Sequence, residues 1–228
     1  MEASLEAAAA SKPPPLEQLI PPAFWPQVPA DLPALLAQLP GADLYLQDEI
    51  QFDLHPTLTR VWSRKGRRGQ RRVEAPGQNQ KVHGFGIVDW CEGWFDGLIA
   101  PGRTVAAFCE QLQAALARSQ ARGRTAIVLA DNLRTHTPQG SLKVRRLLAH
   151  YAGQLTIVCT PAYDPDRNPI EQLCRVSRRT VTHNHQRTSM DTLVQDVQAH
   201  FRDLQSNRDR VLGHIGSHCT HPCQVYDA

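Results

Sequence analysis

A short apolar run that ends on an acidic residue constrains the fold of this chain more than any other feature. Five apolar residues, Ala126 to Ala130, stand in a row and are followed directly by Asp131. A continuous apolar run of this length is typical of a strand buried on both faces, as in the middle of a parallel sheet. A carboxylate at the carboxyl end of such a strand fits the crevice where open α/β sheets bind ligands. The run therefore predicts an α/β domain with a functional site at Asp131.

Length and composition are those of one folded domain with an extension. The chain has 228 residues and a net charge of +3, so composition alone does not indicate a nucleic-acid partner. Six cysteines are scattered without a C-x-x-C pair, which favours reduced thiols in a cytosol over a disulfide framework. No apolar run approaches transmembrane length, and Glu2 and Glu6 stand where a signal peptide would be basic. We expect a cytoplasmic protein.

The order of predicted elements indicates a particular α/β fold. Residues 1–41 read as a Pro/Ala-rich arm and residues 211–228 as a His- and Cys-containing tail, which leaves 42–210 as the folded domain. Periodicity and turn signals predict strands at 43–49, 82–90, 94–100, 125–131 and 155–159, and helices that begin at 104, 141, 168 and 189. This order is that of ribonuclease H-like domains, which have a mixed five-stranded sheet with helices on both faces.

In such a fold, three acidic residues are expected to converge. The ends of the first and fourth strands are neighbours, which would set Asp48 beside Asp131, and Glu171 begins the helix across from them. Three converging carboxylates repel one another and raise one another's pKa, which is tolerated where they bind divalent cations. Oxygen ligands suit Mg²⁺, with Mn²⁺ as a substitute, and two such ions roughly 3.5–4 Å apart can clamp a phosphoryl displacement. We predict a two-metal site of these three residues.

Two motifs make the chain resemble a known family. Asp131-Asn132-x-x-x-His136 is followed by a segment that runs from Tyr163 to Asn168-Pro169-Ile170-Glu171, and Asp48-Glu49 ends the first predicted strand. These residues resemble the catalytic signature of DDE transposases of the Tc/mariner superfamily, in its bacterial insertion-sequence branch, over about residues 43–205. The resemblance implies a metal-dependent enzyme that cleaves DNA and transfers the cut strand, with Asp48, Asp131 and Glu171 as catalytic and metal-binding residues. It gives Asn132, His136 and Asn168 supporting roles, and Asn132 and His136 would either orient the second acid or contact DNA phosphate.

The resemblance also implies binding partners, and the sequence departs from the family's pattern at several positions. The partners are double-stranded DNA, at the element ends and a TA target, and a second copy of the chain in a homodimer, with the protein at the bacterial nucleoid. A helix-turn-helix region does not precede the first strand, so we expect it on a separate N-terminal half. Asp164, Arg167 and Cys174 replace the family's Ser, Leu and Trp, and Cys174 removes a large packing anchor behind Glu171. The alternative is an inactive remnant that binds DNA or a protein partner.

Residues 60–72 form a basic stretch without an acid, and two interpretations of it remain open. It is either a solvated loop or a loop that contacts DNA phosphates through its cations. In the second interpretation the contacts come from Arg64, Lys65, Arg67, Arg68, Arg71 and Arg72. Trp62 could stack on a base, although we expect it to pack in the core.

Two further features have a structural and a chemical interpretation. Glu171 could be a capping-box residue instead of a metal ligand, because Asn168, Pro169 and Glu171 have the spacing of a helix start. The His and Cys residues at 214–223 have no spacing typical of a zinc finger, so we expect a flexible tail there.

Overall fold

The computed structural model describes residues 41–62, 64–66, 72–73, 76, 80–160 and 168–216. Predictions for the N-terminal arm, for 217–228 and for Arg67, Arg68, Arg71, Asp164 and Arg167 lie outside these residues. The strands are β1 (Ala42–Asp53), β2 (Lys81–Asp89), β3 (Phe95–Ala100), β4 (Thr125–Ala130) and β5 (Leu155–Cys159). The helices are α3 (Val105–Ala121), the short η4 (Arg134–His136), α4 (Leu142–His150), α5 (Ile170–Thr182), α6 (Met190–Ser206) and α7 (Arg208–Ile215).

The five strands form one mixed sheet in the order β3-β2-β1-β4-β5. β1, β2 and β3 pair antiparallel, whereas β4 lies parallel to β1 and to β5. The buried run at 126–130 is β4, with a neighbour on each side, as its composition predicted. This topology confirms the ribonuclease H-like fold.

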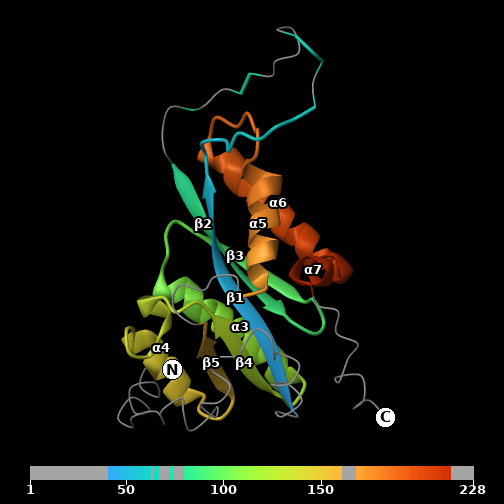
Figure 1. Cartoon of the computed structure of the whole chain (residues 1–228). Helices are drawn as coiled ribbons and strands as arrows, with labels where there is room; N and C mark the ends of the chain where they lie inside the picture. The colour runs from blue at the N-terminus through green and yellow to red at the C-terminus, as the bar shows by residue number, and fades with distance from the viewer. Residues whose placement is uncertain are drawn as a thin grey trace.

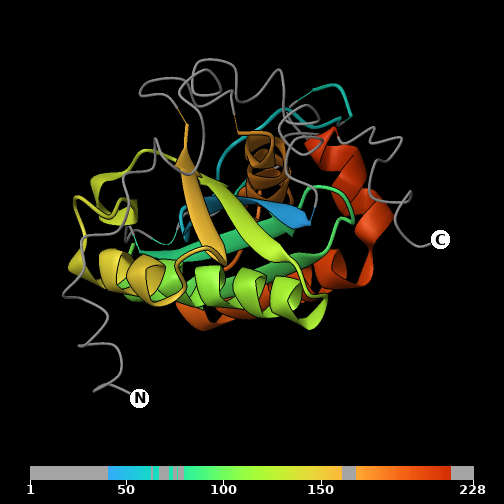
Figure 2. The same ribbon diagram turned by 90° about the horizontal axis from the view of Figure 1, so that it is seen from below.

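Helices cover both faces of the sheet (Figures 1 and 2). On one face α3 and α4 close a core with Tyr45, Phe85 and Val128. On the other face α5, α6 and α7 close a second core with Leu46, Phe52 and Leu129. None of the helices in the described part of the chain is long and apolar enough to cross a membrane.

Local signals in the sequence predicted where most helices begin. The side chains of Thr104, Ser141 and Ser189 each accept a hydrogen bond from a backbone N–H in the first turn of α3, α4 and α6. Such caps satisfy amide donors that have no partner within the helix. The predicted starts at 104, 141 and 189 are therefore confirmed.

Two predicted boundaries are wrong. β1 continues to Asp53 instead of ending at Glu49, because Ile50 and Phe52 face the core and extend the pairing with β2. Asp48 therefore lies inside a strand and not at its end. The tail does not begin at residue 211 either, since α7 reaches Ile215, and Val211 and Ile215 are buried in the core.

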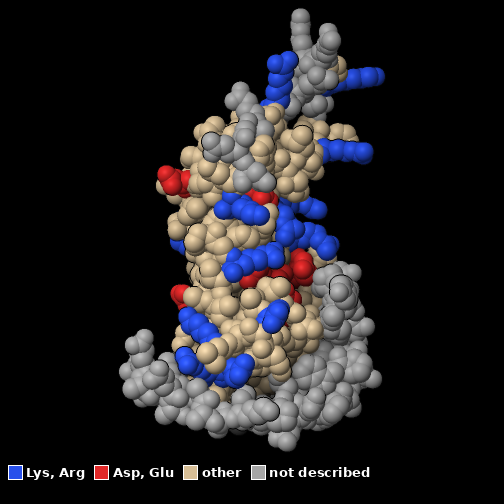
Figure 3. Space-filling view, turned by 90° about the vertical axis from the view of Figure 1, so that its left-hand side faces the viewer, with Lys and Arg blue, Asp and Glu red and all other residues tan. Residues whose placement is uncertain are grey.

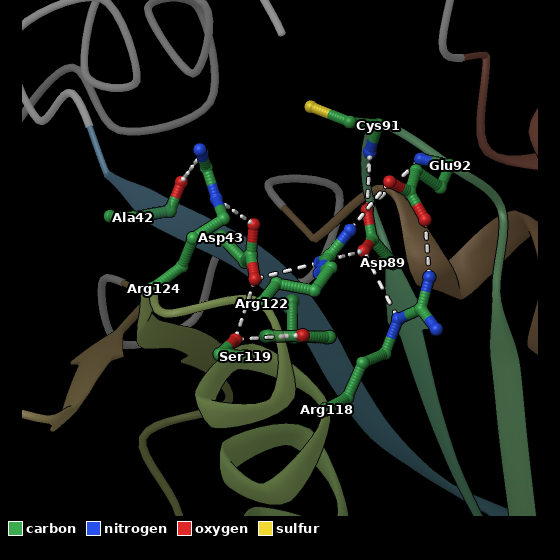
Figure 4. A network of polar contacts seen from close by, with 10 residues as sticks. Ala42, Asp43, Asp89, Cys91, Glu92, Arg118, Ser119, Arg122 and Arg124 are labelled. Carbon is green, nitrogen blue, oxygen red and sulfur yellow. Dashed lines mark hydrogen bonds and ion pairs between the residues drawn. The ribbon is translucent and has the colours of Figure 1, made fainter. Parts of the chain in front are cut away.

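A network of charged side chains ties the start of β1 to the β2–β3 turn and to the end of α3 (Figure 4). The buried Asp43 contacts Arg122 at 2.7 Å and Arg124 at 2.6 Å, and it accepts a hydrogen bond from Ser119 at 2.7 Å. Arg122 also reaches Asp89 at 3.1 Å. Acidic groups in this region thus have arginines beside them.

Glycines let α6 pack close to the sheet. A Cβ atom at Gly84 of β2 would lie 2.8 Å from both the Phe201 ring of α6 and the Phe52 ring of β1. Distances this short do not occur between unstrained atoms, so a side chain at this position would displace two buried rings.

We predict that Gly84→Ala destabilises the fold, because the added methyl group has no room between Phe52 and Phe201. The expected loss in free energy of unfolding is about 1–3 kcal/mol, as for other overpacked cores. Gly102→Ala is the matched control, since nothing lies within 4 Å of its Cβ position. Chemical denaturation measures both variants, and equal stabilities would contradict this account of the packing.

Candidate active site

Strand register places two of the three predicted acids on adjacent strands. Parallel pairing of β1 with β4 matches Leu46 with Leu129. Two residues further along the same register, Asp48 falls opposite Asp131, which directly follows β4. The prediction that these residues are neighbours therefore follows from strand pairing, although Asp48 is not at a strand end.

Asp48 lies where burial and other acids oppose its ionisation. Burial, followed by the charge of Glu171 and, more weakly, that of Asp131, raises the pKa of Asp48 to about 7. The Cys174 thiol donates a hydrogen bond to the Asp48 carboxylate, and the amide of Glu49 donates a second at 2.7 Å. Both other acids thus lie within electrostatic reach of Asp48.

Cys174 also connects α5 with β1. Its side chain is buried in the same core as Leu173 and Leu46. Burial, and then the charges of Asp48 and Glu171, raise the pKa of the Cys174 thiol, so it remains a neutral donor. The small residue at the family's Trp position therefore still connects the helix that bears Glu171 to the strand that bears Asp48.

Asn168 fixes the start of α5 on β1. Its buried amide donates to the backbone carbonyl of Gln47 at 2.9 Å, and its carbonyl oxygen accepts from the Ile170 amide at 3.4 Å. This bond is that of an N-cap, and Pro169 already has helical backbone angles, so Asn168 caps α5 as the sequence predicted. The alternative role of Glu171 in a capping box needs a bond from its side chain to the Asn168 amide, and the described residues show no such bond. The charge of Glu171 instead acts on Asp48.

His136 holds Asp131 from one side. Two roles were open for His136, orienting the second acid or contacting DNA phosphate, and its contacts favour the first. Nδ1 lies 2.5 Å from Asp131 Oδ1, and Nε2 lies 3.1 Å from Glu49 Oε1. The ring stacks on Phe108 of α3 at 4.0 Å between centroids, and only 2% of its side chain is exposed. Burial alone would lower the pKa of His136, but the hydrogen bonds and charges of the two carboxylates raise it to about 9. The ring is therefore a cation at neutral pH, bridging two acids.

These contacts leave one oxygen of Asp131 available. Oδ1 accepts from His136 and from the Leu133 amide, at 3.3 Å. Despite burial, the hydrogen bond and charge of His136 lower the pKa of Asp131, so it is ionised at neutral pH. Oδ2 has no hydrogen bond within the described residues and remains free to bind a ligand.

Glu49 and Arg103 belong to the site, but sequence reasoning gave them no role. β-strand alternation turns Glu49 away from Asp48, toward the face that α3 covers. There Glu49 binds His136 with one oxygen and Arg103 with the other, at 3.0 Å. Glu49 has a side-chain exposure of 6%, whereas Arg103 is 53% exposed. The adjacent acids Asp48-Glu49 were a visible signal, but a contact with His136, 87 residues away, is not readable from spacing.

The other predicted residues lie at the surface. Asn132 is exposed beside Asp131 and makes no hydrogen bond within the described residues. Arg64, Lys65 and Arg72 are exposed on the connection between β1 and β2. The expectation that Trp62 packs in the core is wrong, because its side chain is fully exposed. On one face of the molecule Lys and Arg side chains surround a small acidic patch (Figure 3).

The donor groups suit a divalent cation, although they do not form a closed metal cage. Among the described residues, no three His, Cys, Asp or Glu side chains already surround one point closely enough to hold a metal. Yet the pKa of Asp48 is raised by two acids, and Asp131 Oδ2 has no partner within the described residues. Carboxylate oxygens are the ligands of Mg²⁺ and Mn²⁺ and not typical of zinc. The donor atoms of the three acids therefore fit such a cation by their chemistry.

Fold and site together define a nuclease-like domain with carboxylates at the centre of a ribonuclease H-like sheet. A sequence model of the family described as "DDE superfamily endonuclease" matches residues 43–194. That match spans more than half of the chain, and it contains Asp48, Asp131 and Glu171. The chain belongs to the DDE superfamily of endonucleases.

Individual relatives agree with this assignment. The chain is 28% identical over 163 residues to the "Insertion element IS630 uncharacterized 39 kDa protein" of Shigella sonnei, covering 72% of this chain and 45% of that protein. Its fold is similar to that of the Mos1 transposase in a strand transfer complex, at 17% identity and a TM-score of 0.53, covering 85% of this chain and 58% of that one. A Mos1 mariner paired end complex with Mn gives 16% identity and a TM-score of 0.53, over 86% and 62% of the two chains. The chain thus spans about half of its insertion-element relative and about three fifths of the Mos1 chains.

We predict that the two ion pairs of Glu49, one with His136 and one with Arg103, contribute unequally to the stability of the fold. Glu49→Gln leaves the buried His136 cation with one charged partner, and the expected loss in free energy of unfolding is about 3 kcal/mol. Arg103→Gln removes a half-exposed partner, so its expected cost stays below about 1 kcal/mol. Denaturant titrations in EDTA compare the variants. Similar losses in the two variants would show that the buried Glu49–His136 pair contributes no more to stability than the Glu49–Arg103 pair does.

Proposed function

We propose that this chain is the catalytic part of a transposase that cuts DNA at the ends of a mobile element and joins the freed strand to a target. The observation that carries the proposal is the β1–β4 register, which brings Asp48 opposite Asp131, together with the effect of the Glu171 and Asp131 charges on the partly buried Asp48. Membership of the DDE endonuclease family and the likeness to an insertion-element protein support the same function.

Each residue of the site has a distinct task in this proposal. Asp48, Asp131 and Glu171 would hold two Mg²⁺ ions, or Mn²⁺ in their place, which when bound stabilise charge on the attacking and leaving oxygens of the phosphodiester. His136 holds Oδ1 of Asp131, so that Oδ2 is the oxygen left for a cation. Asn168 keeps the start of α5, and with it Glu171, against β1.

The partners follow from the chemistry and the family. The substrate we propose is double-stranded DNA, first at the element ends and then at a TA target. Two copies would act together as a homodimer, and a helix-turn-helix half would supply recognition of the ends. We propose that Asn132, which is exposed and follows Asp131 in the chain, contacts a DNA phosphate. We propose that the protein works in the bacterial cytoplasm, on the nucleoid.

Neutral substitutions of the acids test the proposed chemistry. Asp131→Asn keeps an oxygen that can accept from His136 and Leu133, so it should still fold, with a lower stability because Glu49 is then the one charged partner of His136. Its amide is a poor cation ligand. Glu171→Gln should melt within a few degrees of wild type without metal. Both variants are expected to lose Mn²⁺-dependent plasmid nicking and any rise in melting temperature with Mn²⁺.

Asp191→Asn is the matched control, because Asp191 is an exposed acid in the first turn of α6. It should nick DNA like wild type. If Asp131→Asn or Glu171→Gln nicks DNA at the wild-type rate, the residue is not a metal ligand. If wild type itself never nicks DNA with Mn²⁺, the chain is an inactive binding module.

The basic connection between β1 and β2 generates a separate prediction about DNA affinity. Replacing Arg64, Lys65 and Arg72 with Ala should reduce the slope of log affinity against log salt by up to ~0.9 for each lost phosphate contact. The control keeps the charge: Arg64→Lys with Arg72→Lys should leave the slope unchanged. Fluorescence anisotropy on a random-sequence duplex measures both. An unchanged slope in the Ala variant would make this stretch an ordinary solvated loop.

A further inference from the structure

An exposed apolar cluster lies on the connection between β1 and β2. The described part of the chain has four exposed large apolar side chains, and three of them are in this one segment: Leu58 at 73% exposure, Val61 at 46% and Trp62 at 105%. The fourth, Leu142, lies at the start of α4. Exposed apolar clusters of this kind mark binding surfaces more often than single exposed residues do. We call the described residues 54–62 and 64–66 the β1–β2 arm, which is distinct from the N-terminal arm and is called the arm below.

The base of the arm is fixed to the folded domain. The Thr57 amide donates to the Thr182 carbonyl at 2.9 Å, and the Asn184 amide donates to the Thr57 carbonyl at 3.0 Å. The Asn184 side chain makes two further hydrogen bonds with the backbone of Thr59, at 3.0 and 3.1 Å. Asn184 adopts a positive φ of 48°, which Asn tolerates better than most residues do. Residues 60–62 therefore extend from an anchored base (Figure 1).

The charge of the arm indicates what binds it. Arg60, Arg64 and Lys65 flank Trp62, and the sequence has no acidic residue between Asp53 and Glu74. A cationic segment opposes contact with the same segment of a second copy and attracts a polyanion. Aromatic rings set among cations are the usual combination in proteins that bind unpaired nucleotides, because bases stack on the ring while the cations contact the backbone.

The position of the arm fits contact with DNA beside the cleavage site. The arm is anchored at the carboxyl end of α5, and Glu171 lies in the first turn of the same 13-residue helix. At 1.5 Å per residue, the helix sets Glu171 and Thr182 about 17 Å apart. That distance equals roughly five nucleotide steps of duplex DNA at 3.4 Å each.

We propose that Trp62 stacks on an unpaired base in DNA with an interrupted strand, while Arg60, Arg64 and Lys65 contact the neighbouring phosphates. This inference rests on the proposed function, because cutting DNA produces such interrupted strands. It adds a binding site for an unpaired base, located away from the acids that would carry out the cut.

Binding in EDTA tests the proposal without any cleavage. The probes are a 30-base-pair duplex and the same duplex with a one-nucleotide gap, in which 2-aminopurine stands opposite the gap. The full-length chain should bind the gapped DNA more tightly and quench the 2-aminopurine fluorescence. Trp62→Ala should weaken binding to the gapped DNA by about 5- to 100-fold, the range for loss of one stacked base. It should also remove the quenching and bind the intact duplex as wild type does.

Two variants control for aromatic character and for apolar surface. Trp62→Phe should keep most of the gap preference, because a phenyl ring also stacks. Leu142→Ala, at the other exposed apolar site, should behave as wild type. Trp62 is fully exposed, so neither substitution at this residue should alter the melting temperature.

Three results would overturn the proposal. The first is a gap preference that survives in Trp62→Ala. The second is wild-type protein that binds gapped and intact duplex equally. The third is a Trp62→Ala variant that changes the oligomeric state in sedimentation but not the affinity for gapped DNA, which would make the arm a protein contact. If the wild-type chain nicks DNA but does not prefer gapped DNA, only this inference is contradicted. If the wild-type chain prefers gapped DNA but does not nick it, only the proposed function is contradicted.

Discussion

The partly buried carboxylate of Asp48 is the constraint on which the rest of the site depends. The β1–β4 register brings Asp131 opposite it, and α5 presents Glu171 to it. Burial and these two acids oppose its ionisation, and the Cys174 thiol compensates only in part. A protein keeps such an arrangement at a cost in stability, which a bound cation would offset. His136 then holds the second acid, Asp131, and Asn168 fixes the start of the helix that bears the third acid, Glu171.

Buried acids at the start of β1 and the end of β2 are paired with arginines, and in this they differ from Asp48. At the start of β1, the buried Asp43 has Arg122 and Arg124 beside it, and Asp89 also contacts Arg122. That network neutralises its acids with the chain's own side chains. Asp48 has no ion pair within the described residues. The same sheet therefore contains a self-neutralised acidic cluster at one end of β1 and, near its middle, an acid that has no ion pair in the described part of the chain.

Much of the fold was predictable because the signals are local. The apolar run of β4 and the side-chain caps at Thr104, Ser141 and Ser189 are each read from a few adjacent residues. The full length of β1 was missed although Ile50 and Phe52 continue the alternation of a half-buried strand. α7 was missed because it is short and is stabilised by packing of Val211 and Ile215.

The site was predictable only as far as motifs reach. Asp48, Asp131 and Glu171 were selected from motif and topology, and strand register explains why the first two are neighbours. The contact of Glu49 with His136 depends on which face of β1 each side chain occupies and on stacking against Phe108. The exposure of Trp62 depends on where the arm leaves the sheet. Tertiary geometry of this kind has no signature in sequence spacing.

Anomalous scattering from crystals soaked in Mn²⁺ tests the central claim most directly. The account predicts manganese bound by Asp48, by Oδ2 of Asp131 and by Glu171, with Oδ1 of Asp131 still bonded to His136. Manganese bound only at other residues, or no manganese at these three acids at a concentration that supports nicking, would contradict it.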